Sequence, residues 1–128
     1  KPFYPANVDI TISVDVGPEV ITGSTRMKAG TATKMILNMI STATMIRLGK
    51  VYGNLMVDLM AVNEKLVDRG IRIIQDITNL DVENSRRILV AAKMSVKTAL
   101  VMVKKDCNLD VAEKLLMDAN GFIRDVID

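Results

Sequence analysis

The sequence predicts a mainly α-helical chain with one N-terminal strand, two long helices and a small three-helix bundle. Three observations predict this fold class. A single segment alternates apolar and polar residues with period two, two long segments carry apolar residues at helical spacing, and three short helical segments each follow a potential N-cap residue. The 128 residues, of which 49% are hydrophobic and 25% charged, suffice for a folded core.

The strand is expected at residues 9–16, where isoleucine and valine alternate with aspartate, serine and threonine. A single strand leaves its backbone polar groups unpaired, so this strand needs a sheet partner that these 128 residues do not contain. The chain also begins at Lys1 rather than at methionine. We therefore expect it to be a fragment of a longer protein.

The first long helix is expected over about residues 26–48, with Gly49 as its stop. Its apolar side chains cover most of its circumference, which is typical of a helix that is buried or lies at a subunit interface. The second is expected over about residues 58–78. It contains Gly70, which costs about 1 kcal/mol relative to alanine and so suggests close packing at that position.

Three short helices are expected near residues 82–93, 96–105 and 111–118, followed by a last turn after Gly121. Asp81, Ser95 and Asp110 are the predicted N-caps, and Asp110 with Glu113 resembles a capping box. We therefore expect two domains. Residues 1–78 would carry the strand, a loop and the two long helices, and residues 79–128 would form a small three-helix subdomain.

The composition excludes several classes of function. The chain has no histidine and a single cysteine, Cys107, so it holds no Ser-His-Asp triad, no Cys-His pair, no histidine-ligated zinc and no internal disulfide. A net charge of +2 and 3% aromatic residues do not predict nucleic-acid binding. The longest uncharged stretch, residues 35–46, is too short to span a bilayer. We expect a cytoplasmic protein without metal, other cofactor, nucleic-acid partner or membrane partner.

A candidate anion site lies where a loop rich in glycine, serine and threonine turns into the first helix. Residues 20–57 contain no acidic side chain, and Arg26 and Lys28 stand at this junction. The backbone amides at a helix N-terminus favour binding of an anion. The hydroxyls of Ser24 and Thr25 can donate hydrogen bonds to it, and the Arg26 guanidinium can bind a phosphate through two parallel hydrogen bonds. The alternative is that Ser24 or Thr25 only caps the helix, with both cations solvated.

Glu19 lies at the end of the predicted strand, where ligands bind in open α/β sheets. It could hold a substrate hydroxyl or satisfy amides of the loop, and its position does not decide between the two. The candidate site therefore consists of Glu19, Ser24, Thr25, Arg26 and Lys28, and we assign no catalytic residue.

Residues 17–34 read GPEVITGSTRMKAGTATK. This segment resembles the signature shared by N-acetylmuramic acid 6-phosphate etherases and the glucokinase regulatory protein. The similarity continues through residues 48–58 and 63–66, where it is to the bacterial etherases, and residues 120–124 fit their C-terminal end. The resemblance covers nearly all of this chain but only about the C-terminal two-fifths of the family's length.

The resemblance implies that residues 1–78 are the C-terminal portion of a sugar isomerase-type domain, an α/β sandwich with a parallel sheet between helices. Residues 79–128 would be a ubiquitin-associated-like subdomain. Members of the family are cytoplasmic homodimers. They are lyases that cleave the D-lactyl ether of N-acetylmuramic acid 6-phosphate to N-acetylglucosamine 6-phosphate and D-lactate in cell-wall recycling, using glutamates and no metal.

Those glutamates belong to the upstream half of the family, so the 128 residues alone are expected to be inactive. Glu19, Ser24, Thr25, Arg26 and Lys28 are carried over as substrate-binding positions for a phosphosugar. The alternative function is a non-enzymatic sugar-phosphate-binding regulator of the glucokinase regulatory protein type.

The first long helix also predicts self-association. Its apolar surface is too wide for one short neighbour to cover, so we expect a homodimer or a higher homo-oligomer. The alternative is that the second long helix and the small bundle fold back and cover this surface from within the chain.

Overall fold

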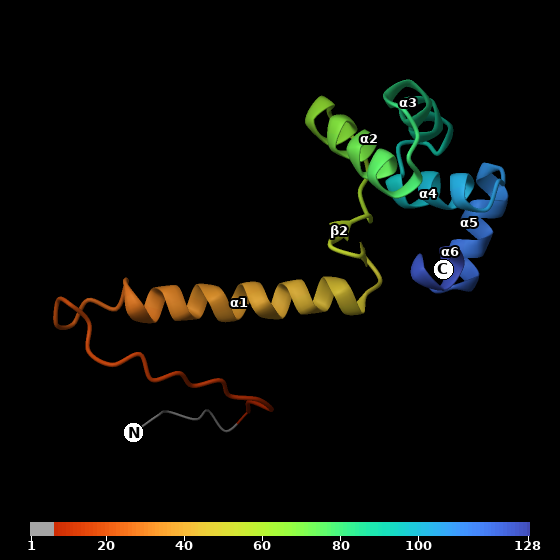
Figure 1. The fold of residues 1–128 in the computed structure, drawn as a ribbon. Coiled ribbons are helices and arrows are strands. Elements are labelled where there is room, and N and C mark those ends of the chain that lie inside the picture. Colours follow the sequence, from red (N-terminus) through yellow and green to blue (C-terminus); the bar gives the residue numbers. More distant parts are fainter. Residues whose placement is uncertain (1–6) are drawn as a thin grey trace. The chain divides into compact units, whose positions relative to one another are not determined.

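The computed structural model describes residues 7–128, which form six helices and a two-stranded sheet (Figure 1). The prediction of a mainly α-helical chain is confirmed. The chain divides into two compact units, Lys1–Ala43 and Thr44–Asp128. The elements in chain order are α1 (Lys28–Arg47), β1 (Val51–Tyr52), β2 (Leu55–Met56), α2 (Glu64–Thr78), α3 (Val82–Ala91), α4 (Val96–Lys104), α5 (Leu109–Asp118) and α6 (Arg124–Ile127).

The predicted strand at residues 9–16 is wrong for this chain, because this segment has no regular secondary structure. Within residues 7–128 the paired backbone consists of β1 with β2, which are antiparallel, and an isolated bridge between Met60 and Ser95. Alternation of side chains suits a strand, but hydrogen bonds to a neighbouring strand are what form one. Residues 9–16 have no such neighbour here, and Ile10 is 78% exposed.

Helix α1 is close to its predicted bounds and ends where glycine was expected. Gly49 has a positive φ of 67°, which lets the chain turn away from the helix axis. The amide of Gly49 donates to the Ile46 carbonyl and that of Lys50 to the Met45 carbonyl, both at 3.1 Å. These bonds satisfy carbonyls at the end of the helix. No residue of α1 is buried.

Helix α2 begins at Glu64, six residues after its predicted start at Asp58. Asn63 caps it, because its side-chain oxygen accepts a hydrogen bond from the Leu66 amide at 3.0 Å. The preceding residues are extended and bond to the segment before α4, as in the 2.9 Å hydrogen bond from the Ala61 amide to the Met94 carbonyl. Tertiary pairing therefore takes these residues away from the helix.

Two of the three predicted N-caps are confirmed. Asp81 accepts from the Asn84 amide at 2.7 Å, and Ser95 accepts from the Thr98 amide at 3.3 Å. The third, Asp110, is wrong. Asn108 caps α5 instead, accepting from the Val111 amide at 3.0 Å, and Asp110 lies inside the first turn. Both residue types suit the position, and the helix begins two residues earlier than the capping-box pattern suggests.

Helix α4 is the centre of the second unit and contacts α2, α3, α5 and α6 (Figure 1). Its residues from Val96 to Val101 are all buried. Because α2 packs against both α3 and α4, the helices on either side of residue 78 share one core. The domain division at residue 78 and the ubiquitin-associated-like description stay predictions.

Close packing at Gly70 is confirmed. A Cβ atom at this position would lie 2.9 Å from Cγ2 of Val96 and 3.3 Å from Cδ2 of Leu89. Glycine therefore lets α2 approach α3 and α4 more closely than any other residue would allow.

Candidate functional site

The predicted site loop, residues 17–28, precedes α1 and is organised by one carboxylate. Glu19 accepts hydrogen bonds from the Lys28 amide, at 3.1 Å to Oε1 and 3.0 Å to Oε2, and from the Ala29 amide at 3.1 Å. These two amides belong to the first turn of α1, where backbone N–H groups have no partner within the helix. Their hydrogen bonds and the nearby Lys28 charge hold the pKa of Glu19 below its usual value.

The Lys28 side chain also binds the start of the loop. Its Nζ donates to the Pro18 carbonyl at 2.8 Å, so the main chain and the side chain of Lys28 both bind the Pro18–Glu19 segment. The backbone of the intervening loop is turned by a 3.0 Å bond from the Ser24 amide to the Ile21 carbonyl. The structure therefore brings Glu19 and Lys28 together.

Ser24, Thr25 and Arg26 lie on the same loop without a partner for their side chains. Within the described residues, neither hydroxyl and no guanidinium nitrogen makes a hydrogen bond or an ion pair, and Thr25 and Arg26 are exposed. Neither hydroxyl caps α1, because Glu19 has that role. All three side chains remain available to a ligand.

This arrangement limits the groups of the loop that are free to bind an anion. The helix amides that favour a phosphate are already occupied by the Glu19 carboxylate. A phosphate would therefore meet the cationic side chains and the hydroxyls, or it would have to displace Glu19. Whether Glu19 also contacts a substrate hydroxyl stays a prediction.

The structure contains a second cluster of charged residues, around Lys97, which the sequence analysis did not predict. Lys97, on α4, is only 9% exposed and donates to the Gly121 carbonyl at 2.9 Å and to the Gly49 carbonyl at 3.1 Å. Its Nζ lies 3.4 Å from Oδ1 of Asp58, whose other carboxylate oxygen pairs with Lys50. Partial burial would raise the pKa of Asp58, but the two lysines outweigh it and lower that pKa.

This Lys97 cluster joins two stretches that lie far apart in the sequence, residues 48–58 and 120–124. A Cβ atom on Gly49 would lie 2.9 Å from the ring of Phe122, so glycine is required for this approach. Tyr52 adds a hydrogen bond of 2.6 Å to the Asp128 carboxylate. The one sequence signal for the cluster is a lysine inside the otherwise apolar face of α4.

The remaining features of the described residues offer no metal centre. Among residues 7–128 no three histidine, cysteine or carboxylate side chains gather as metal ligands would. None of the helices in that part of the chain has the length and apolar character needed to cross a membrane.

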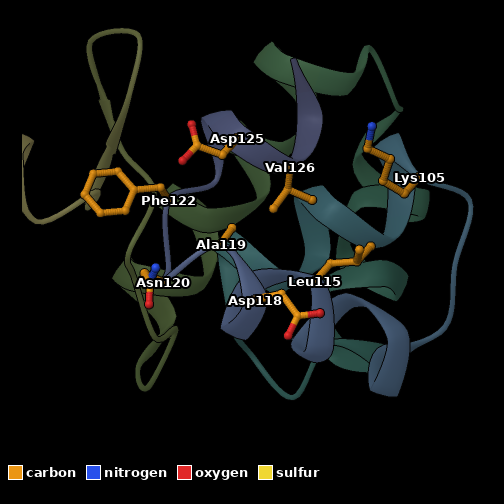
Figure 2. Close-up of a pocket in the computed structure, with 8 residues that line it drawn as sticks. All are labelled: Lys105, Leu115, Asp118, Ala119, Asn120, Phe122, Asp125 and Val126. Carbon is orange, nitrogen blue, oxygen red and sulfur yellow. The ribbon is translucent and has the colours of Figure 1, made fainter.

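A surface pocket of about 860 Å³ lies at the ends of α4 and α5 beside α6 (Figure 2).

The chain is similar to a class of enzymes whose name refers to a phosphorylated amino sugar. No family model matches the chain. The N-acetylmuramic acid 6-phosphate etherase of Oceanobacillus iheyensis is 59% identical over 116 residues, which are 91% of this chain and 40% of that protein. The etherases of Bacillus subtilis and Clostridium acetobutylicum are 55% and 54% identical over 95% and 94% of this chain, again 40% of each relative.

The resemblance that the signature at residues 17–34 predicts is thereby confirmed. The chain is similar in sequence to one part of the N-acetylmuramic acid 6-phosphate etherases. It spans about 40% of the length of the curated relatives that it matches.

Proposed function

We propose that the protein to which this chain belongs is a carbon–oxygen lyase. It would cleave the D-lactyl ether of N-acetylmuramic acid 6-phosphate and release N-acetylglucosamine 6-phosphate and D-lactate during peptidoglycan recycling. The observation that carries this proposal is the 59% identity to an etherase over 91% of the chain. The relatives' names supply the substrate and the cleavage of an ether, and the products and the role in recycling follow from the resemblance.

The loop before α1 is the proposed contact with the phosphosugar. Arg26 and Lys28 supply positive charge, and the unpartnered hydroxyls of Ser24 and Thr25 supply hydrogen-bond donors. Glu19 shapes this loop through the amides of α1 and would lie beside the bound sugar. The site is thus a binding surface, and we propose no catalytic residue in these 128 residues.

The proposal also covers the domain organisation and the oligomeric state of the whole protein. Following the resemblance, we place residues 1–78 in a sugar isomerase-type sandwich and residues 79–128 in a separate helical subdomain. In that sandwich residues 9–16 would acquire the strand partner that they lack here. We also propose a cytoplasmic homodimer, supported by the apolar side chains that α1 leaves exposed.

The test is D-lactate release from authentic N-acetylmuramic acid 6-phosphate by the full-length protein. We expect turnover by the full-length protein and none by the 128-residue chain. Replacing Arg26 with alanine should raise KM about tenfold because a charged contact to phosphate is lost. Arg47→Ala, at the other end of α1, is the control and should leave KM unchanged.

The same assay separates the alternative function. A full-length protein that binds the phosphosugar without releasing D-lactate would be a sugar-phosphate-binding regulator, and the lyase proposal would be wrong. Turnover by the 128-residue chain alone would show that its own residues are catalytic.

A further inference from the structure

The pocket in the second unit has an apolar floor. Leu115 and Ala119 on the α5 side and Val126 of α6 gather at its centre (Figure 2). Val126 is buried and the other two are half-buried. The volume of about 860 Å³ falls within the range of pockets that hold a small molecule or a peptide side chain with its neighbours.

Unpaired charges surround this floor. Asp118 and Asp125 line the pocket with exposed carboxylates, and Lys105 lines it as well (Figure 2). In the part of the chain that the structure describes, none of these three side chains makes a hydrogen bond or an ion pair. The two carboxylates outnumber the single cation, so the rim favours a cationic group on an occupant.

The pocket is also lined by residues of the stretch 120–124, which has no part in the proposed site loop at residues 17–28. Asn120 and Phe122, from the stretch at residues 120–124, contribute to its wall. The Lys97 cluster holds this same stretch in place through the Gly121 carbonyl. The wall is therefore held by a partly buried hydrogen bond, which favours a pocket that exists before anything binds.

We propose that this pocket docks a peptide segment of a partner protein that presents an apolar side chain next to a basic residue. The apolar side chain would cover Leu115, Ala119 and Val126, and the basic group would lie between Asp118 and Asp125. Lys105 would face a carbonyl or carboxylate oxygen of the segment. This interaction is separate from the proposed lyase activity and does not depend on it.

The experiment uses a fluorescent synthetic peptide, Gly-Lys-Leu-Phe-Lys-Gly, titrated with the 128-residue chain and with the full-length protein while anisotropy is recorded. The comparison peptide is Gly-Glu-Leu-Phe-Glu-Gly. The double variant Asp118→Asn/Asp125→Asn removes both rim charges with little change of shape. The control Asp110→Asn/Glu113→Gln changes the net charge equally on α5 but away from this pocket.

We expect the basic peptide to bind more tightly than the acidic one. The rim variant should weaken that binding about fivefold, since two exposed ion pairs are lost, and the control variant should leave it unchanged. No binding, equal binding of both peptides, or equal weakening by both variants would overturn the proposal. A rim variant that changes only the sedimentation of the chain would also overturn it, because the occupant would then be a second copy.

Discussion

Glu19 is the residue on which the structure of the site loop depends. Its carboxylate binds the Lys28 and Ala29 amides, which are otherwise unpaired at the start of α1. We expect Glu19→Ala to speed hydrogen exchange at these two amides by at least about fivefold, because the local cap is lost. Glu19→Gln, which keeps one acceptor oxygen, should have a smaller effect. Unchanged exchange in Glu19→Ala would show that the carboxylate does not cap the helix.

Lys97 is nearly buried and binds two carbonyl oxygens and one carboxylate. Replacement by methionine keeps the volume but leaves the Gly49 and Gly121 carbonyls without this donor. We expect the free energy of unfolding to fall by about 2 kcal/mol, measured by urea denaturation. Lys104→Met, at an exposed position on the same helix, is the control and should change it by less than about 0.5 kcal/mol.

Asp58 makes the stability of the same cluster depend on pH. Its pKa lies below the ordinary value of 3.8, because Lys50 and Lys97 outweigh the effect of partial burial. A carboxylate with a lowered pKa in the folded state stabilises the protein above its unfolded pKa, and this contribution is lost as the pH falls through the folded pKa. Urea denaturation between pH 6 and pH 3 should therefore show a smaller loss of stability in Asp58→Asn than in the unmodified chain. Equal losses would contradict this role.

At the scale of elements, Gly70 and Gly30 form a matched pair of helical glycines. Alanine at position 70 would meet Val96 and Leu89, whereas alanine at position 30 would meet only the Thr25 carbonyl at an ordinary 3.5 Å. We expect Gly70→Ala to lower the free energy of unfolding by about 1–3 kcal/mol despite its better helix propensity. Gly30→Ala should increase the helical circular dichroism slightly or leave it unchanged. A stabilised Gly70→Ala variant would show that the core relaxes around the added methyl group.

At the scale of the whole molecule, α1 is the surface that we propose for self-association. It has no buried residue, and Met35, Leu37 and Met39 are each more than half exposed. Such a surface favours a partner, because burying apolar area is worth about 25 cal/mol per Å². We expect the 128-residue chain to sediment as a dimer or larger species at micromolar concentration. Met35→Glu/Met39→Glu should shift it toward the monomer, and a monodisperse monomer of the unmodified chain would contradict this prediction.

The features that could be predicted from the sequence are those that local chemistry controls. Helical spacing placed five of the helices, Asp81 and Ser95 were identified as caps, and Gly49 was identified as a stop. Each of these features depends on residues within a few positions of one another, so the pattern is readable along the chain. The signature at residues 17–34 likewise predicted the similarity to the etherases, because a dense motif is itself a local pattern.

The long-range contacts could not be predicted from the sequence and are visible in the folded chain. Residues 9–16 have the pattern of a strand but no neighbour, since a strand depends on another segment. Residues 58–62 pair with the segment before α4 rather than extending α2. The sequence shows Lys97 only as a lysine among the apolar residues of α4, and the fold brings Gly49, Asp58 and Gly121 around it. A buried charge is stabilised by partners distant in sequence, and only the folded chain shows which they are.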